Sequence, residues 1–209
     1  MTNWNLPPQE IERLSWEIIE AEAPPHAWPP DAWRVIRRMI HTTADFDWVA
    51  NTRIHPLAME RGVQAIKAGA TVYTDTRMAQ AGISAKRLAP YGCQVRCLMD
   101  DPQVARLASE QGTTRAVAAV DLALPELTGA IYVVGNAPTA LYRLLQHIET
   151  AQARPALVVG LPVGFVNAAE AKQALAQSSQ PFITAQGRKG GSAVAACVIN
   201  ALAELCGEG

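Results

Sequence analysis

The first part of the chain shows the hydrophobic period of helices. In "PPQEIERLSWEIIEAEA" (7–23), apolar side chains recur at every third or fourth position and mark one helical face, at Ile11, Leu14, Ile18 and Ile19. The segment "PPHAWPP" (24–30) contains four prolines and breaks this helix. A second helix is predicted to start with Asp31 as its N-cap and to run through Ile40, because apolar residues again share a face.

From residue 70 onward, short apolar runs alternate with helix-forming stretches. The five runs are 71–75, 94–99, 130–135, 156–160 and 181–185. Apolar runs of this length between helices are typical of buried parallel strands in β–α–β units. We therefore predict an α/β fold, a three-layer α/β/α domain with a five-stranded parallel sheet. A single domain over 1–209 is expected, mostly helical over 1–69 and sheet-forming over 70–209.

Nearly every apolar run ends in glycine or a polar residue. Asp75 and Asp100 follow the first two runs, and "GNAPT", "GLPVG" and "GRKGGS" follow the other three. Ligands of open α/β sheets bind beyond the carboxyl ends of the strands, where helix N-termini attract anions. We therefore predict a ligand site on these loops, with a binding role for Gly135, Gly160, Gly164, Gly187, Gly190 and Gly191. A tight turn is the alternative explanation for any one of them.

Charge and motif content argue against several classes of protein. The chain has 18 basic and 19 acidic residues and no basic run, so no nucleic-acid partner is expected. No apolar stretch approaches the ~20 residues of a membrane span, and no signal-peptide pattern is present. Four cysteines without C-x-x-C spacing indicate reduced thiols, so we expect a cytoplasmic protein without a disulfide framework or a metal site. The usual nucleotide-binding and nucleophile-elbow motifs are missing, which argues against a nicotinamide enzyme, a P-loop protein and a serine hydrolase of the α/β-hydrolase type.

Of the four histidines, His41 is the strongest candidate for acid–base chemistry. It follows the apolar stripe of the second helix in "RRMIHTTADFDW" (37–48) and is flanked by the polar groups of Thr42, Thr43 and Asp45. A satisfied histidine at a helix end is the alternative explanation. The others lie in the proline-rich break, in a turn and near a helix end: His26, His55 and His147. We expect His147 to be structural.

Four segments are similar to one known family. The strings "RRMIHTTADFDW", "GNAPTALYRLL", "GLPVGFVNAAEAK" and "GRKGGSAVAA" resemble the precorrin-8X methylmutase family of cobalamin biosynthesis, and the likeness extends over essentially the whole chain. The string "IHTTADF" is similar to the branch that acts on cobalt-precorrin-8, whereas Ala171 departs from a serine common in the family. The resemblance implies a flavodoxin-like fold and a cytoplasmic homodimeric isomerase with sites near the subunit interface and no cofactor.

The resemblance also implies a reaction. The family catalyses a suprafacial 1,5-sigmatropic shift of a methyl group from C-11 to C-12 of the macrocycle, which gives cobyrinate or hydrogenobyrinate. The family's catalytic histidine falls on His41 by its place in "MIHTT". Protonated His41 is then expected to protonate or hydrogen-bond a ring nitrogen, which makes the conjugated ring electron-poor and lowers the barrier to migration.

Such a substrate is a broad apolar tetrapyrrole fringed by carboxylates, so a chain of net charge −1 needs local donors for them. Arginine suits this role because its fork grips a carboxylate at two points, and Arg115 also matches a family segment. The expected substrate-binding residues are Thr42, Thr43, Arg53, Arg77, Arg115, Gly135, Asn136, Gly164, Arg188, Lys189, Gly190, Gly191 and Ser192. Surface solvation is the alternative for any one arginine, and bonding back into the helix is the alternative for the two threonines.

All five tryptophans lie in the first 48 residues: Trp4, Trp16, Trp28, Trp33 and Trp48. We expect core packing or a dimer contact from them, in preference to stacking on the macrocycle. Two alternatives to an isomerase remain, namely a tetrapyrrole carrier without catalysis and a flavodoxin-like regulator or mononucleotide binder. Loss of methyl migration in a His41→Ala variant separates an isomerase from a carrier, and an FMN titration tests the nucleotide binder.

Overall fold

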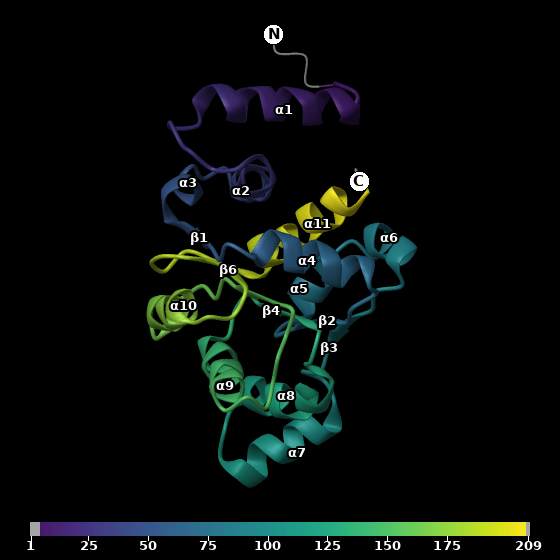
Figure 1. Ribbon diagram of the computed structural model, residues 1–209, viewed down its shortest axis with the longest axis vertical. Helices are drawn as coiled ribbons and strands as arrows, with labels where there is room; N and C mark the ends of the chain where they lie inside the picture. The colour runs from purple at the N-terminus through teal and green to yellow at the C-terminus, as the bar shows by residue number, and fades with distance from the viewer. Residues whose placement is uncertain (1–4, 208–209) are drawn as a thin grey trace.

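The computed structural model describes residues 5–207 as three layers, with a sheet between two groups of helices (Figure 1). The strands are β1 (Thr52–Ile54), β2 (Val72–Thr74), β3 (Val95–Cys97), β4 (Ile131–Val134), β5 (Leu157–Gly160) and β6 (Phe182–Ala185). The helices are α1 (Pro8–Glu22), α2 (Pro30–Thr43), α3 (Asp47–Asn51), α4 (Ala58–Lys67), α5 (Arg77–Gly82), α6 (Ala85–Leu88), α7 (Pro102–Gln111), α8 (Arg115–Ala123), α9 (Pro138–Glu149), α10 (Ala168–Gln177) and α11 (Ser192–Cys206), with 3-10 turns at η1 (Ala89–Tyr91) and η2 (Leu124–Glu126). The predicted α/β/α architecture is confirmed.

The sheet has the strand order β1-β6-β5-β4-β2-β3. Strands β2 to β6 pair in parallel, and each coincides with one of the five apolar runs, so these strand predictions are confirmed. Counted along the chain, the five parallel strands have the 2-1-3-4-5 order of flavodoxin-like folds. The direction of winding reverses between β2 and β4, which makes the carboxyl ends of these two strands the topological switch point.

The prediction of five strands is wrong by one, because β1 adds an antiparallel edge beside β6. Thr52 pairs with Ala185 and Ile54 pairs with Ile183. The strand has only three residues and carries Arg53 in the middle, so no apolar run marks it in the sequence. A short, charged strand of this kind is typical of a sheet edge.

Alternating side chains of the strands build two cores, one on each face of the sheet. On one face, residues such as Val72, Ile131 and Val159 pack with α2, α4 and α11. On the other face, residues such as Tyr73 and Val158 pack with α8, α9 and α10. Burial on both faces explains why the central strands read as unbroken apolar runs. It also fixes their carboxyl ends rigidly at one edge of the sheet.

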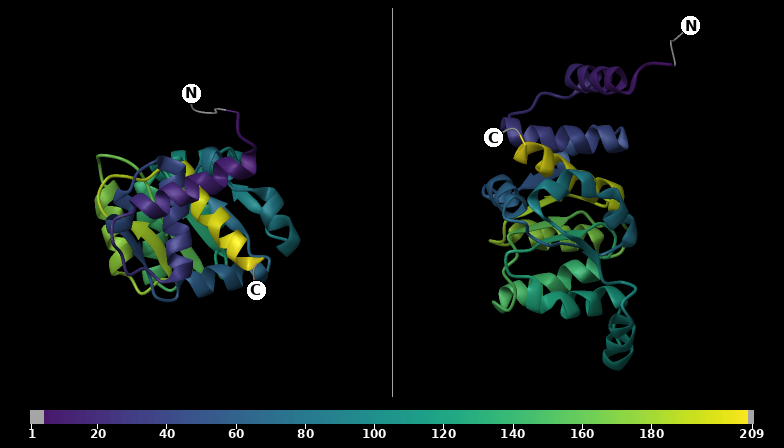
Figure 2. Two further views of the ribbon diagram at one scale, coloured as in Figure 1. Left: turned by 90° about the horizontal axis from the view of Figure 1, so that it is seen from above. Right: turned by 90° about the vertical axis from the view of Figure 1, so that its right-hand side faces the viewer.

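The N-terminal helices form a further layer beyond α11. Helix α2 packs on α11 and α1 packs on α2, so α1 is the outermost element in Figure 2. Helix α2 starts at Pro30 with Pro29 at its N-cap, and the expected N-cap residue Asp31 lies inside the first turn. Proline is favoured at the first helical position because its ring fixes φ near the helical value. The N–H that it lacks would have no partner within the helix at this position.

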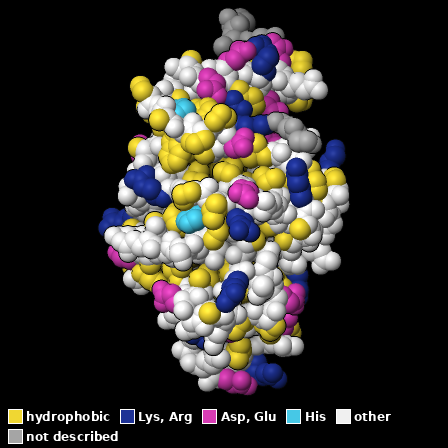
Figure 3. All heavy atoms as spheres, viewed as in Figure 1, with side chains coloured by type: hydrophobic (Ala, Val, Ile, Leu, Met, Phe, Trp, Pro, Cys, Tyr) yellow, Lys and Arg dark blue, Asp and Glu magenta, His cyan; other side chains and the backbone are white. Residues whose placement is uncertain are grey.

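The tryptophans serve this N-terminal packing. Trp33 and Trp48 are buried in the core, and Trp16 and Trp28 pack against it, as expected; Trp4 lies outside the described residues. All four cysteines have free thiols. Within residues 5–207 we find no helix with the length and apolar character of a membrane span. Acidic and basic side chains are interspersed on the face seen in Figure 3.

Candidate functional site

Asp75 occupies the topological switch point. Its side chain is buried at the end of β2, and its carboxylate accepts hydrogen bonds from the backbone N–H groups of Gly135 (2.9 Å), Asn136 (2.8 Å) and Ala137 (2.7 Å). These groups form the turn between β4 and α9. Burial raises the pKa of Asp75, although the three hydrogen bonds act in the opposite direction.

This arrangement disfavours a mononucleotide at the switch point. In doubly wound folds, a ligand phosphate takes the N–H groups between a strand end and the next helix. Here the carboxylate of Asp75 already takes three of them at the start of α9. A phosphate would meet a negative charge in place of free donors. The flavodoxin-like mononucleotide binder is therefore the weaker alternative.

Two of the predicted glycines have a packing role. A Cβ atom on Gly135 would lie 2.6 Å from Cα of Ser192, and one on Gly190 would overlap the carbonyl oxygen of Leu161. The hydroxyl groups of Ser192 and Thr76 lie 2.8 Å apart, which ties the start of α11 to the N-cap of α5, just beyond β2. Close approach of the strand-end loops therefore explains these two positions without a ligand.

The loops after β5 and β6 are joined to each other. The N–H of Gly164 donates to the carbonyl of Arg188 (3.2 Å), and the N–H of Gly191 donates to the carbonyl of Leu161 (2.8 Å). The guanidinium of Arg188 lies over the ring of Phe165, 5.4 Å from its centroid. Two backbone hydrogen bonds thus hold the loops together, and the Arg188 guanidinium packs on the exposed Phe165 ring.

Phe165 and its neighbour Val166 form an apolar surface that sequence reasoning missed. Their exposed fractions are 84% and 77%, which is unusual for large apolar side chains. Only Gly164 was singled out from this loop. The available signal is the string "GFV" (164–166) in the loop after β5, because two large apolar residues in a loop are not expected to be buried in the core.

His41 lies exposed in the last turn of α2. Its ring contacts the ring of Trp16 on α1, with centroids 4.7 Å apart. A hollow of about 400 Å³ surrounds the imidazole, and it is lined by Ser15, Ile18, Ile19 and Glu22 of α1 and by Ile40, Ala44 and Phe46. The imidazole is therefore accessible to a ligand, and it faces α1 in this single chain.

The threonines beside His41 bond mainly to their own helix. The hydroxyl of Thr42 donates to the carbonyl of Arg38, and that of Thr43 donates to the carbonyl of Met39, both at 2.8 Å. The indole N–H of Trp48 donates to the Thr43 hydroxyl (2.7 Å). These contacts match the back-bonding alternative, so Thr43 braces the turn into α3.

Lys189 ties the His41 segment to the strand-end loops. Its Nζ lies 2.5 Å from Oδ2 of Asp45 and 2.6 Å from Oδ2 of Asp47, on the turn between α2 and α3. Burial alone would raise the pKa of Asp45, but Lys189 and the N–H of Asp47 hold it below its ordinary value. Among the described residues, the Asp45 carboxylate therefore bonds to Lys189 and to the N–H of Asp47, and not to His41.

Three predicted cations lie in different settings. Arg77, at the start of α5, pairs with Asp100 beyond β3 (2.7 Å). Arg115 is exposed at the start of α8, whose N-cap Thr114 lies 3.3 Å from Thr139 on α9. Both arginines thus lie beside the strand-end loops. Arg53 is on β1 instead, and its Nη1 donates to backbone carbonyls of Ala50 and Thr52.

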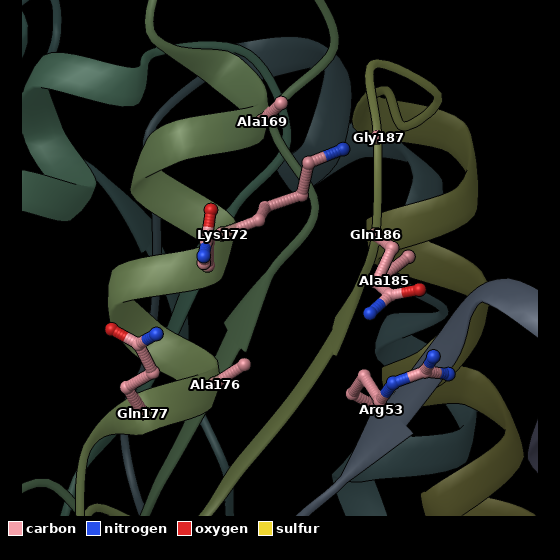
Figure 4. Close-up of a pocket in the computed structure, with 9 residues that line it drawn as sticks. Arg53, Ala169, Lys172, Ala176, Gln177, Ala185, Gln186 and Gly187 are labelled. Carbon is pink, nitrogen blue, oxygen red and sulfur yellow. The ribbon is translucent and has the colours of Figure 1, made fainter.

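Arg53 lines a cavity of about 460 Å³ between α10 and the β1 edge (Figure 4). Lys172 extends from α10 across this cavity toward the loop that contains Gly187. It is fully buried, its Nζ donates to the carbonyl oxygen of Lys189 (2.5 Å), and burial lowers its pKa to about 8. Like Phe165 and Val166, Lys172 is not among the residues that the sequence predicts for the site.

The remaining histidines have structural settings. His147 is buried, with Nε2 2.6 Å from Asp121 and Nδ1 2.8 Å from Gln152, which confirms the structural expectation. His26 is exposed and His55 lies in the turn after β1. Among the residues that the structure describes, no group of three or more histidine, cysteine or acidic side chains is arranged to hold a metal ion.

Comparison with known proteins decides the family. The model of the precorrin-8X methylmutase family matches residues 10–205. The chain belongs to this family. It is 46% identical to the cobalt-precorrin-8 methylmutase of Salmonella typhimurium, over 93% of this chain and 94% of the relative. It is 41% identical to the precorrin-8X methylmutase of Pseudomonas aeruginosa, over 93% and 94% of the two chains.

A solved structure agrees with this assignment. The crystal structure of the precorrin-8X methylmutase of Thermus thermophilus superposes with a TM-score of 0.88 at 46% identity, covering 95% of this chain and 96% of that one. Relatives named cobalt-precorrin-8 methylmutase and relatives named precorrin-8X methylmutase thus have similar identities to this chain, 46% and 41% in the two examples above.

Proposed function

We propose that this protein is an isomerase of cobalamin biosynthesis that moves a methyl group from C-11 to C-12 of precorrin-8. The reaction is a 1,5-sigmatropic shift that gives cobyrinate from the cobalt-containing substrate or hydrogenobyrinate from the metal-free one. The observation that carries the proposal is the placement of the histidine of the family motif. His41 lies accessible in a hollow, on a helix end that Lys189 ties to the strand-end loops.

In this proposal His41 acts as a proton donor toward a ring nitrogen. A positively charged or hydrogen-bonded macrocycle draws electron density from the bond that migrates, and such positioned proton donation contributes on the order of 10²–10⁴-fold to a rate. The imidazole contacts the ring of Trp16 on α1, with the two ring planes tilted by 36°. No resident metal or cofactor takes part, and cobalt enters only as part of the substrate.

The exposed loops provide the surfaces that such a substrate needs. Phe165 and Val166 offer apolar area to the macrocycle, and Arg188 stands next to them. Arg77 and Arg115 are exposed near the same edge of the sheet and are candidates for the peripheral carboxylates. Of the two substrates, we favour the cobalt form because of the string "IHTTADF" around His41.

We further propose that the enzyme works as a homodimer. Within one chain the hollow beside His41 is open, and α1 leaves Ile11 (48% exposed) and Ile18 (54% exposed) without full cover. A macrocycle is too broad for a hollow of about 400 Å³. A second subunit across α1 would cover these residues and enclose the ligand.

The test is incubation of the purified protein with cobalt-precorrin-8 and, separately, with its metal-free counterpart, while the visible spectrum of the corrin product is followed. We expect turnover by the wild type and by a His26→Asn control, because His26 is exposed in the proline-rich loop. His41→Ala should bind substrate but lose at least about 10²-fold in kcat. Tight binding without turnover in wild type and variant alike would identify a carrier and refute the isomerase.

A further inference from the structure

The turn between α2 and α3 sets the position of His41. Helix α2 ends at Thr43, and Ala44 then adopts a left-handed conformation (φ 52°) before α3 begins at Asp47. A left-handed backbone is unfavourable for any residue except glycine. The turn therefore needs tertiary contacts to hold it. His41 lies one helical turn before Ala44, so a change in the direction of the chain at Ala44 would displace the imidazole.

One ammonium group spans this turn. Asp45 lies on the α2 side and Asp47 is the first residue of α3, and Nζ of Lys189 contacts both carboxylates at 2.5 and 2.6 Å. Asp45 also accepts the N–H of Asp47 (3.0 Å). The ion pairs are exposed, so they add little to the free energy of unfolding. Instead, they link the end of α2 and the start of α3 to Lys189, which lies in the loop between β6 and α11.

The backbone of Lys189 is itself anchored to a buried side chain. The backbone carbonyl of Lys189 accepts a hydrogen bond from Nζ of Lys172, a fully buried side chain on α10. No carboxylate forms an ion pair with Lys172 among the described residues. A buried cation without an acidic partner is unfavourable for stability, so its presence calls for a reason other than stability.

We infer that Lys172 and Lys189 act in series as positioning residues for His41: Lys172 fixes the β6–α11 loop, and the side chain of Lys189 fixes the α2–α3 turn to that loop. The inference rests on the proposed methylmutase function and names two residues that serve it without touching the reacting atoms. In this inference the Lys189 ammonium pairs with Asp45 and Asp47. It therefore differs from a role in which Lys189 binds a substrate carboxylate directly.

The test compares Lys189→Met, the double variant Asp45→Asn with Asp47→Asn, and the triple variant that combines them. We expect kcat to fall by roughly tenfold in each, with KM and Tm unchanged, because small displacements of a catalytic group are expensive in rate. The triple variant should be no slower than the others, since all remove one linkage. Arg106→Met is the matched control, because it removes an exposed ion pair with Glu110 on the remote α7.

A second set of variants tests the buried part of the series. Lys172→Met should lower kcat by a similar factor without lowering Tm, because it removes an unpaired buried charge, and it should not add to Lys189→Met. Lys189→Arg, which keeps a cation over both carboxylates, should recover most of the rate. The NMR signals of the His41 ring should shift in Lys189→Met and stay in place in Arg106→Met. If Lys172→Met does not fold, Lys172→Gln replaces it, and the Lys189 variants still decide.

The outcomes separate this inference from the proposed function. Absence of turnover in the wild type would refute the function. Turnover in the wild type with an unchanged kcat in Lys189→Met would refute the positioning role. A raised KM in Lys189→Met, together with a normal KM and kcat in the Asp45/Asp47 double variant, would also refute it and would assign Lys189 to a substrate carboxylate instead.

Discussion

Replacement of Asp75 by asparagine tests whether the carboxylate closes the switch point. The side chain is 2% exposed and has two oxygens that serve three backbone N–H groups. Asparagine has one oxygen. In its better orientation this oxygen serves Asn136 and Ala137, and the amide NH₂ then faces the N–H of Gly135. In the other orientation two N–H groups lose their acceptor.

The expected loss of stability follows from the number of backbone N–H groups that lose their acceptor. A buried donor without a partner loses about 1–3 kcal/mol, and the two remaining hydrogen bonds change from charged to neutral acceptors and weaken. The neutral amide avoids part of the carboxylate's desolvation, which offsets some of this loss. We expect the free energy of unfolding to fall by about 2–4 kcal/mol.

Urea unfolding followed by far-UV circular dichroism measures this change, with the slope m as a check that both proteins unfold in the same way. Asp101→Asn is the matched control, because Asp101 also accepts a backbone N–H, from Gln103 (2.9 Å), but at the exposed N-cap of α7. Asparagine and aspartate are about equally good N-caps, so the free energy of unfolding of Asp101→Asn should fall by less than about 0.5 kcal/mol. A loss for Asp75→Asn no larger than that of the control would refute the role assigned to the carboxylate.

Three further changes test other parts of the structure. Gly190→Ala places a Cβ against the backbone oxygens of Leu161 and Pro162, so it should destabilise the protein by about 1–3 kcal/mol in urea and lower methylmutase activity. Ala44→Val puts a β-branched residue at φ 52° and should cost about 1–2 kcal/mol, whereas Ala44→Gly should cost nothing; equal midpoints for the two variants would contradict this. Lys172 has a pKa of about 8 when folded, below its value of about 10.4 when unfolded, so above pH 8 the unfolded chain binds more protons. Stability should therefore rise by roughly 1–3 kcal/mol from pH 8 to pH 10, relative to Lys172→Met, and an identical pH profile for the two proteins would disprove it.

The parts of the fold that are predictable from sequence are those with a local signal. The five parallel strands are buried on both faces and appear as apolar runs, whereas β1 has three residues and depends on pairing with β6 for its existence. The polar string after an apolar stripe makes His41 a candidate, but it leaves the helix-end alternative open, and the predicted catalytic role comes from the family motif. The N-cap of α2 is Pro29, two residues before the expected Asp31, and a difference of this size is within the precision with which helix ends can be predicted.

Lys172 and the contacts of Lys189 had no such signal. In "AAEAKQALAQ" a lysine reads as the solvated face of a helix, and only the tertiary approach of the loop after β6 buries it. In the sequence, Lys189 is a cation in a glycine-rich loop. Its partner could equally be a ligand carboxylate or, as in the structure, Asp45 and Asp47. Residue type indicates a charge that needs a partner, and only the fold decides which partner it has.

The use of Asp75 also bears on how this fold binds its ligand. A flavodoxin-like sheet normally offers the N–H groups at its switch point to one compact anion. Here an internal carboxylate takes them, so the site cannot recognise a ligand through that cradle. In the proposed function, recognition comes instead from groups farther out, namely Arg77, Arg115 and the Phe165 loop, which are exposed near the same edge of the sheet. Spread donors around an apolar surface suit a wide ring with carboxylates at its rim better than a single phosphate, which is the substrate shape that the proposed reaction requires.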